Sequence, residues 1–217
     1  MRSTWLLAAA FVIGTVGIAF GGGGGAGGGG GNPGGGSNPY GGGMPSKQEI
    51  EKKVKEYLDG LPATDAEWQK IKITYKPVPS DPAEVIKGTG AVPAGGKADA
   101  AVKQYMPMAK PYIEKSMAEI GKLTNEPEFT AGKTKIVAGE YEFGIVLNDL
   151  TPVAIKISGK TLKAPAQVPL KATPAKTPYA KLAIEIKEGK KEGEFTIEVG
   201  FGAVLGTAKF QLAAAKK

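Results

Sequence analysis

The most informative stretch of this sequence is residues 181–201, KLAIEIKEGKKEGEFTIEVGF. Apolar and polar side chains alternate on both sides of a charged segment at 188–193 that contains glycine. Alternation with a period of two places successive side chains on opposite faces of a β-strand. Two such runs around a polar turn predict a hairpin with one dry face. The side chains expected on that face are Leu182, Ile184, Ile186, Phe195, Ile197, Val199 and Phe201.

The same alternation extends through much of residues 126–217. A first strand is expected over 134–138, and further inward positions are expected at Tyr141, Phe143, Ile145, Leu147, Val153, Ile155, Ile157, Ala208, Phe210 and Leu212. Prolines at 165, 169, 174 and 178 restrict residues 162–177 to edge strands or extended crossings, because proline lacks the N–H that a central strand needs. Short alternating strands at this density predict a compact antiparallel β-sandwich over residues 126–217.

Residues 46–125 are expected to form a mainly helical segment. Ser46 and Glu49 have the spacing of a capping box, and Ile50, Val54 and Leu58 follow at helical intervals. Gly60 with Pro62 should end this first helix.

The next part of the segment, residues 64–75, has two interpretations. Thr64 and Glu67 repeat the capping-box spacing, and Trp68, Ile71 and Tyr75 fit one helical face. Ile71, Ile73 and Tyr75 also alternate, so a strand remains an alternative.

Two further helices are expected in this segment. Asp81 and Pro82 should open a short helix that ends at Gly88. Residues 98–123 predict a longer helix, broken or kinked near Pro107 and Pro111, with an apolar stripe at Met106, Ile113, Met117 and Ile120. The predicted fold class is therefore α+β, with the helical segment 46–125 packed on or beside the sandwich.

The first 45 residues have the composition of an export signal and a tether. Arg2 precedes an apolar run at 6–20, and small residues follow, so residues 1–20 are expected to be a cleaved signal peptide. An uncleaved membrane anchor is the alternative, although a spanning helix needs about 20 apolar residues. Residues 21–45 predict a flexible glycine-rich tether. The expected location is secreted, periplasmic or at the cell surface, with membrane contact only through the signal segment.

Composition excludes several chemistries. The 217 residues include no histidine and no cysteine, which rules out Ser-His-Asp and thiol nucleophiles and metal sites built on imidazole or thiolate. The formal net charge is +7, but Arg2 is the single arginine and lysines alternate with glutamates. This pattern is typical of a solvated surface and argues against a nucleic-acid partner.

Carboxylates, lysines and cations bound by oxygen ligands are the remaining candidates for catalysis. The candidate carboxylates are Glu126, Glu128, Glu140, Glu142 and Asp149. Glutamates that alternate with aromatic residues are usually the solvent face of a strand, so no catalytic, cofactor-binding or metal-ligating residue is assigned.

Four other features are interpreted as structural. The runs 132–134 and 159–161 (GKT in both) are expected to be turns, and 200–206 (GFGAVLG) a strand end with a bulge. Trp68 is expected to anchor the core, with stacking on a sugar or partner as the alternative that it shares with Tyr40.

Two stretches resemble a known family. Residues 135–144, KIVAGEYEFG, are similar to an AG-x-Y strand pair, and 182–212 are similar to a closing hairpin with a charged loop. Both resemble the secreted bacterial family called domain of unknown function 2911, over about residues 132–212. The Arg- and Trp-containing N-terminal part of that family is not matched. The resemblance implies an exported β-sandwich and no known activity or active-site residues.

Three functional hypotheses follow. The first is an exported, non-catalytic binding or structural module of the bacterial cell envelope, whose partner is an envelope polysaccharide or another envelope protein. The second is a carboxylate-dependent hydrolase acting on envelope or extracellular glycans. The third is a binder of anionic polymers, which requires the lysines to gather on one face of the folded protein.

Overall fold

The computed structural model describes residues 46–91 and 98–213. The signal peptide expected at 1–20 and the tether expected at 21–45 lie outside these residues. All described residues belong to one compact unit, Gly42–Lys217. This unit is mixed but strand-dominated, and its strands form two antiparallel sheets.

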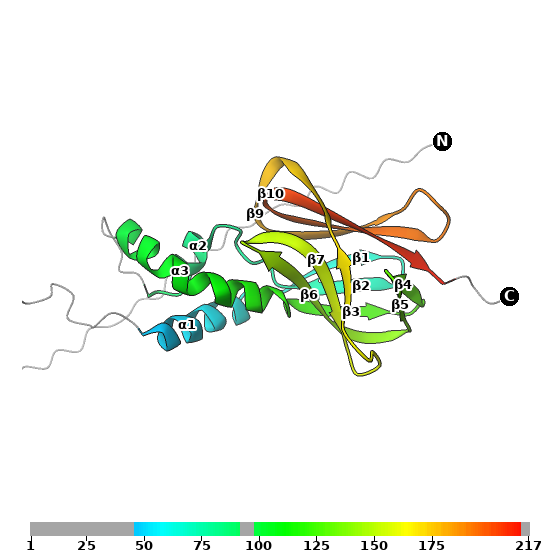
Figure 1. Cartoon of the computed structure of the whole chain (residues 1–217), viewed down its shortest axis with the longest axis horizontal. Helices are drawn as coiled ribbons and strands as arrows, with labels where there is room; N and C mark the ends of the chain where they lie inside the picture. The colour runs from blue at the N-terminus through cyan, green and yellow to red at the C-terminus, as the bar shows by residue number, and fades with distance from the viewer. Residues whose placement is uncertain (1–45, 92–97, 214–217) are drawn as a thin grey trace, which may run out of the picture. The chain divides into compact units, whose positions relative to one another are not determined.

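The larger sheet has the strand order β1-β2-β3-β6-β7-β8 (Figure 1). Its strands are β1 (Thr64–Trp68), β2 (Ile71–Tyr75), β3 (Gly121–Asn125), β6 (Gly139–Asn148), β7 (Thr151–Ser158) and β8 (Ala166–Pro169). The smaller sheet has the order β5-β4-β10-β9. Its strands are β4 (Phe129–Ala131), β5 (Thr134–Ile136), β9 (Lys171–Glu188) and β10 (Glu194–Leu212).

Both sheets contribute to one hydrophobic core, as the alternation predicts. Tyr141 and Phe143 from β6 are buried together with Ile184 and Ile186 from β9, and with Phe195 and Ile197 from β10. The Phe195 ring stacks on Phe210 at 5.1 Å between ring centres and meets the edge of Phe129 at 5.4 Å. The predicted dry face of the hairpin is therefore confirmed.

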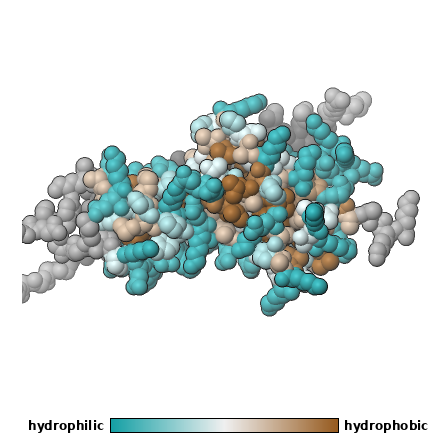
Figure 2. Space-filling view, viewed as in Figure 1, coloured by the Kyte–Doolittle hydropathy of each residue, from teal (hydrophilic) through white to brown (hydrophobic). Residues whose placement is uncertain are grey.

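Strand β7 departs from the prediction at Val153. The pairing of β6 with β7 shifts there, because Leu147 pairs with Pro152 and Val146 with Ala154. Val153 is left in a bulge with 38% of its surface exposed, while Ala154 and Ile155 are both buried. The inward position expected for Val153 is wrong, because one extra residue changes the phase of the strand. Figure 2 shows hydrophobic atoms near the middle of the viewed face, in the region where Figure 1 draws β7.

The helical interpretation of residues 64–75 is wrong, and the alternative strand is confirmed. β1 and β2 form a hairpin in which Gln69, with φ +51°, occupies the turn. β2 also pairs with β3, about fifty residues later. This long-range pairing supplies the backbone hydrogen bonds, so it outweighs the local capping signal at Thr64.

The three helices are α1 (Lys47–Asp59), α2 (Pro82–Gly88) and α3 (Ala98–Met117). The Ser46 capping box forms in both directions, with distances of 2.6 and 3.2 Å. Asp81 caps α2 by accepting a hydrogen bond from the Ala83 N–H at 2.8 Å. None of the described helices has the length and apolar composition needed to cross a membrane.

Helix α3 differs from its prediction at its end. It runs continuously through Pro107 and Pro111, so of the two predicted alternatives, a break or a kink, the break does not occur. It ends at Met117, and the residues from Gly121 form β3 instead of a last helical turn. β3 pairs with β2 on one side and with β6 on the other. The predicted boundary at 125–126 therefore separates strands that belong to one sheet.

Two glycines let the chain approach closely where the helices meet the larger sheet. A Cβ at Gly144 of β6 would lie 2.0 Å from the carbonyl oxygen of Ala118, just after α3. A Cβ at Gly121 would lie 2.2 Å from the carbonyl oxygen of Thr74. Figure 1 shows the helices gathered at this end of the sheets. A side chain at either position would separate the elements that meet there.

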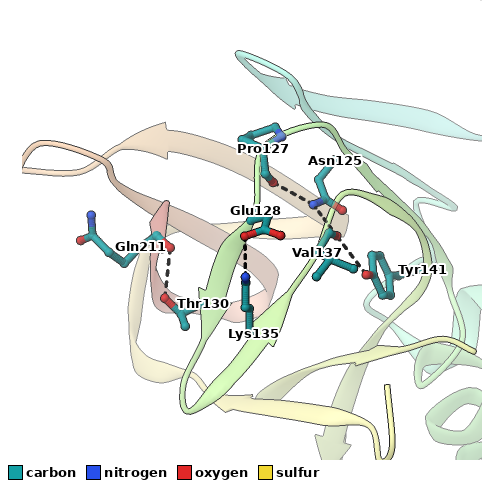
Figure 3. Close-up of polar contacts among 8 residues, drawn as sticks. All are labelled: Asn125, Pro127, Glu128, Thr130, Lys135, Val137, Tyr141 and Gln211. Carbon is teal, nitrogen blue, oxygen red and sulfur yellow. Dashed lines mark hydrogen bonds and ion pairs between the residues drawn. The ribbon is translucent and has the colours of Figure 1, made fainter. Parts of the chain in front are cut away.

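Asn125 closes the other end of β3, where the chain leaves for β4 and β5 and returns to β6. Its Nδ2 donates to the carbonyl oxygens of Pro127 at 2.8 Å and Val137 at 3.0 Å (Figure 3). The residue is 2% exposed, and its Oδ1 has no hydrogen-bond partner within residues 46–91 and 98–213. One amide therefore joins the two chain segments that leave and rejoin the larger sheet.

Candidate functional site

A cavity of about 420 Å³ lies where α1 and the end of α3 meet β2, β3 and β6. Its apolar lining comes from Leu58, Tyr75 and Ile120, which are buried. Leu58 follows Val54 on the inward face of α1, and Ile120 lies in the turn between α3 and β3. The close approach at Gly121 and Gly144 brings these elements together around the cavity.

The mouth of the cavity carries charges of both signs. Lysines 55, 76, 115 and 122 alternate with carboxylates 51, 59, 119 and 142 along its lining. The volume of the cavity lies within the range of small-molecule sites, and its base is apolar as in such sites.

Several of these charges are paired. Asp59 forms ion pairs with Lys55 and, at 3.8 Å, with Lys76, which also donates to the Asp59 carbonyl oxygen. The hydrogen bond from Lys55 holds the pKa of Asp59 below its ordinary value. Glu119 lies 3.8 Å from Lys156 of β7. The lowered pKa favours the anionic form of Asp59, which suits binding better than proton donation.

Other charges at the mouth are less compensated. Lys115 of α3 is exposed and forms no ion pair with the described residues, and Lys122 has Glu142 as its cross-strand neighbour. Burial raises the pKa of the Tyr112 phenol, and a hydrogen bond with the Glu51 carboxylate raises it further. The cavity thus offers a cation at Lys115, a carboxylate at Glu142 and a phenol beside an apolar base.

The carboxylates considered for catalysis do not converge. Glu140 and Glu142 are exposed on β6, and only Glu142 lines the cavity. Asp149 pairs with Lys110, and Glu126 pairs with Lys70. Glu128 lies 2.6 Å from Lys135 across the β4–β5 hairpin (Figure 3). Glu126, Glu128 and Asp149 are thus each paired with a different lysine, and of the five carboxylates only Glu140 and Glu142 share a strand.

The shifted carboxyl pKa values of the described residues all lie below the ordinary value. Hydrogen bonds from Ser46, Lys55, Lys72 and Lys209 lower the pKa of Glu49, Asp59, Asp65 and Glu194 respectively. A general acid of a glycosidase instead needs a raised pKa. Within residues 46–91 and 98–213, no three acidic side chains gather closely enough to hold a metal ion.

The remaining sequence features are structural. Gly132, with φ +62°, turns the chain between β4 and β5, and residues 159–161 lie in the connection after β7. The 200–206 stretch carries the predicted bulge, although it lies inside β10 and not at a strand end. Trp68 stacks on Phe195 at 5.4 Å, so its core role is confirmed, on a strand instead of a helix. Tyr40 lies outside the described residues.

Sequence reasoning missed the cavity and one surface. No sequence pattern joins Lys115 to Glu142, because only the helix–sheet contact brings them to one place. The surface did have a signal in the sequence: residues 151–184 contain lysines but no aspartate or glutamate. In comparisons with known proteins, no family model, no curated protein and no solved structure matches this chain.

Proposed function

We propose that this chain is an exported, non-catalytic binding or structural module of the bacterial cell envelope. Its N-terminal helices pack beside a sandwich of two antiparallel sheets, an architecture that commonly presents binding surfaces. The support for the sandwich is the single core to which both sheets contribute. The support for export is the apolar run at residues 6–20 and the glycine-rich stretch after it.

The observation that carries the binding role is the cavity between α1, α3 and the larger sheet. Its base is apolar, and its mouth includes Lys115 and Glu142, neither of which has an ion-pair partner among the described residues. Such a site suits a ligand with an apolar body and charges of both signs, which is the chemistry of a short peptide. We therefore assign the cavity to a peptide-like ligand.

The carboxylates support binding over hydrolysis. A glycosidase places two carboxyl groups across its cleft, one with a raised pKa. Here the hydrogen bond from Lys55 favours the anionic form of Asp59, so this carboxylate acts as a fixed charge at the mouth of the cavity. Glu119 lies 3.8 Å from Lys156.

The test measures peptide binding and turnover together. The purified full chain is titrated calorimetrically with tetrapeptides that carry one acidic, one basic and one large apolar side chain, and the mixtures are analysed by mass spectrometry. We expect saturable binding without cleavage. Lys115→Glu should weaken it at least about tenfold, as expected when one charge-assisted contact becomes repulsive.

Lys103→Glu is the matched control, because it makes the same exchange on an exposed position of the same helix away from the cavity. Cleavage of the peptides, or equal weakening by both variants, contradicts the proposal. Cleavage of oligosaccharides by the same preparation would support the hydrolase instead.

Export has its own test. Fractionation of bacteria that express the full chain should recover it outside the cytoplasm, with a mass that shows removal of about the first twenty residues. Recovery of the intact chain in the cytoplasm contradicts export and leaves the cavity assignment unaffected.

A further inference from the structure

The lysines of the protein are not evenly spread over its surface. Residues 46–91 and 98–213 contain 24 lysines and 21 acidic residues, a formal charge of +3. Residues 151–184 hold six of these lysines and no acidic residue, so they carry +6 and leave −3 for the rest. About one fifth of the described residues therefore carry a charge of +6, which exceeds the +3 of all the described residues together.

Five of the six lysines are exposed and have no ion-pair partner among the described residues. These five are Lys160, Lys163, Lys171, Lys176 and Lys181. The sixth, Lys156, is mostly buried along its stem and lies 3.8 Å from Glu119. Elsewhere lysines such as Lys187, which contacts both Glu185 and Glu198, are neutralised by their neighbours. We call the five unpaired side chains the lysine edge.

The lysine edge follows edge strands of both sheets. Lys160 and Lys163 lie in the β7–β8 connection, β8 is the last strand of the larger sheet, and the other three lie on β9, the last strand of the smaller sheet. The chain passes from β8 to β9 through Leu170, whose N–H donates to the Val153 carbonyl oxygen at 2.9 Å. The five cations therefore lie on consecutive segments of the chain along the edges of the two sheets.

Hydrogen bonds hold this rim in place. The Thr161 hydroxyl donates to the Tyr141 hydroxyl at 3.2 Å, which anchors the connection that carries Lys160 and Lys163. The Thr173 hydroxyl donates to the Leu205 carbonyl oxygen at 3.1 Å, next to Lys171. Near Lys181, the Ser80 N–H donates to the Ala180 carbonyl oxygen at 3.0 Å. The cations are therefore presented from ordered backbone.

The rim is poorly suited to recruit a peptide strand. Strand addition needs free backbone donors along an edge. Pro165, Pro169, Pro174 and Pro178 have no N–H, and the Leu182 N–H is already bonded to the Val78 carbonyl oxygen at 2.7 Å. Recognition at this rim must come from the lysine side chains, so the partner is anionic.

The number of cations favours a polymer over a small anion. The five lysines are spaced three to eight residues apart along the chain. A linear chain of anions carries enough charges to pair with several of them at once, whereas a single phosphate or carboxylate does not.

Apolar content disfavours a membrane as the partner. Surfaces that insert into a bilayer present several large apolar or aromatic side chains. Among the described residues, Val153 is the one large hydrophobic side chain with more than a third of its surface exposed. The lack of arginine in residues 151–184 also disfavours a nucleic acid, which is read and gripped chiefly through arginine.

We infer that the lysine edge binds a linear acidic polysaccharide. The inference extends the proposed function, because it names a ligand class for a second surface, and it does not involve the cavity. The interaction is electrostatic, so its affinity falls as salt is added.

The experiment compares two triple variants of equal net charge. Lys171→Gln/Lys176→Gln/Lys181→Gln removes three cations of the lysine edge. Lys103→Gln/Lys133→Gln/Lys191→Gln removes three exposed lysines that have no ion-pair partner among the described residues and lie elsewhere. Binding of the full chain to polygalacturonate is measured at about 30 mM salt, where screening is weak. Neutral dextran is the control polymer.

We expect the wild-type chain to bind polygalacturonate and not dextran. The edge triple should lose about 10- to 100-fold in affinity and the control triple less than about threefold, because only the edge lysines contact the polymer. Equal losses in both variants would overturn the inference, since net charge alone would then account for binding. Absence of polygalacturonate binding would overturn it as well.

Two further measurements separate this surface from its rivals. Vesicles of phosphatidylglycerol that bind as tightly as the polymer, with the same dependence on the edge triple, would overturn the inference in favour of a membrane. Lys115→Glu should leave polymer binding unchanged. Failure of polymer binding alongside intact peptide binding therefore overturns this inference alone, and the reverse result contradicts only the cavity assignment.

Discussion

The helix-covered end of the larger sheet and the β8–β9 rim use the same residue type in opposite ways. At the covered end, several lysines pair with carboxylates: Lys55 pairs with Asp59, and Lys110 of α3 pairs with Asp149 after β6, whereas Lys115 has no ion-pair partner among the described residues. At the rim, lysines such as Lys171 and Lys176 have no carboxylate near them in the sequence. Paired lysines cancel and serve the fold, whereas unpaired lysines leave a potential that a ligand can use.

The two regions also differ in packing. The covered end relies on contacts that leave no space for a Cβ at Gly144, while the rim consists of exposed residues between prolines. The covered end should therefore be sensitive to small changes in shape, and the rim should be sensitive only to changes in charge.

The largest expected effect is at Gly144. Gly144→Ala places a Cβ 2.0 Å from the Ala118 carbonyl oxygen, so the end of α3 must move away from β6. We expect a loss of about 3 kcal/mol in the free energy of unfolding, the upper part of the range for overpacking. Urea unfolding followed by circular dichroism measures it.

Gly60→Ala is the control at the same end of the fold. Gly60 has φ −78°, and its nearest contact to an added Cβ is 3.3 Å. Its effect should stay within about 1 kcal/mol. A loss at Gly144 no larger than that at Gly60 would show that the helix–sheet contact is loose, and the contrast between the two regions would disappear.

The next effect concerns the end of β3 that a single amide closes. Asn125→Leu leaves the carbonyl oxygens of Pro127 and Val137 without their donor, which should cost about 2 kcal/mol. Loss of the unpartnered Oδ1 offsets part of this cost. Gln211→Leu is the control. It removes an exposed amide whose Nε2 donates to the backbone carbonyl oxygen of Glu192 at 3.1 Å, and it should change the free energy of unfolding by less than about 0.5 kcal/mol. Comparable urea midpoints for the two variants would contradict this role of Asn125.

A smaller effect distinguishes paired from unpaired lysines directly. Lys110→Gln breaks the ion pair with Asp149 and should lower stability by about 0.5 kcal/mol. Lys171→Gln/Lys176→Gln/Lys181→Gln removes mutual repulsion and should leave stability unchanged or raise it by about 0.5 kcal/mol at low salt. Thermal unfolding at about 20 mM and 500 mM salt measures the stability change of each variant, and both changes should be smaller at high salt. A marked destabilisation of the triple variant would mean that the rim lysines serve the fold.

The smallest effect is the acid dependence of the carboxylates. Hydrogen bonds from Lys55 and Lys72 hold the pKa of Asp59 and Asp65 below the ordinary value of 3.8. A folded pKa below the unfolded one means that the stabilisation is present above pH 3.8 and is lost as the pH falls through the folded value. The urea midpoint should therefore drop below about pH 4. Lys72→Met should reduce that drop, whereas Lys133→Met should not. Identical pH profiles would contradict the assignment to these pairs.

Elements whose pattern matches their surroundings were predictable. α1 has its own capping box and an apolar stripe, and β9 and β10 alternate around a polar turn, so local and tertiary preferences agree. Residues 64–75 failed because their helical signal competes with pairing to β3, which is remote in the sequence. Val153 failed because a bulge changes the phase of β7, and the neighbouring Pro152 is the one local feature that indicates it.

The candidate sites divide in the same way. The lysine edge is visible in the sequence, because an acid-free run of 34 residues keeps its charge however it folds. The cavity is not visible, because Glu51, Lys115 and Glu142 belong to three elements that only packing brings together.

Periodicity thus specifies the strands, capping residues specify the first helix, and prolines and charge specify the lysine edge. Composition specifies the excluded chemistries. None of these features depends on contacts between residues that are distant in the sequence. The order of the strands, the bulge at Val153, the joining of residues 64–75 to the larger sheet and the cavity depend on contacts between distant residues. Many alternative arrangements would bury apolar surface and pair the backbone N–H and C=O groups. The contacts that form are those of the arrangement with the lowest free energy, which is a property of the whole folded molecule.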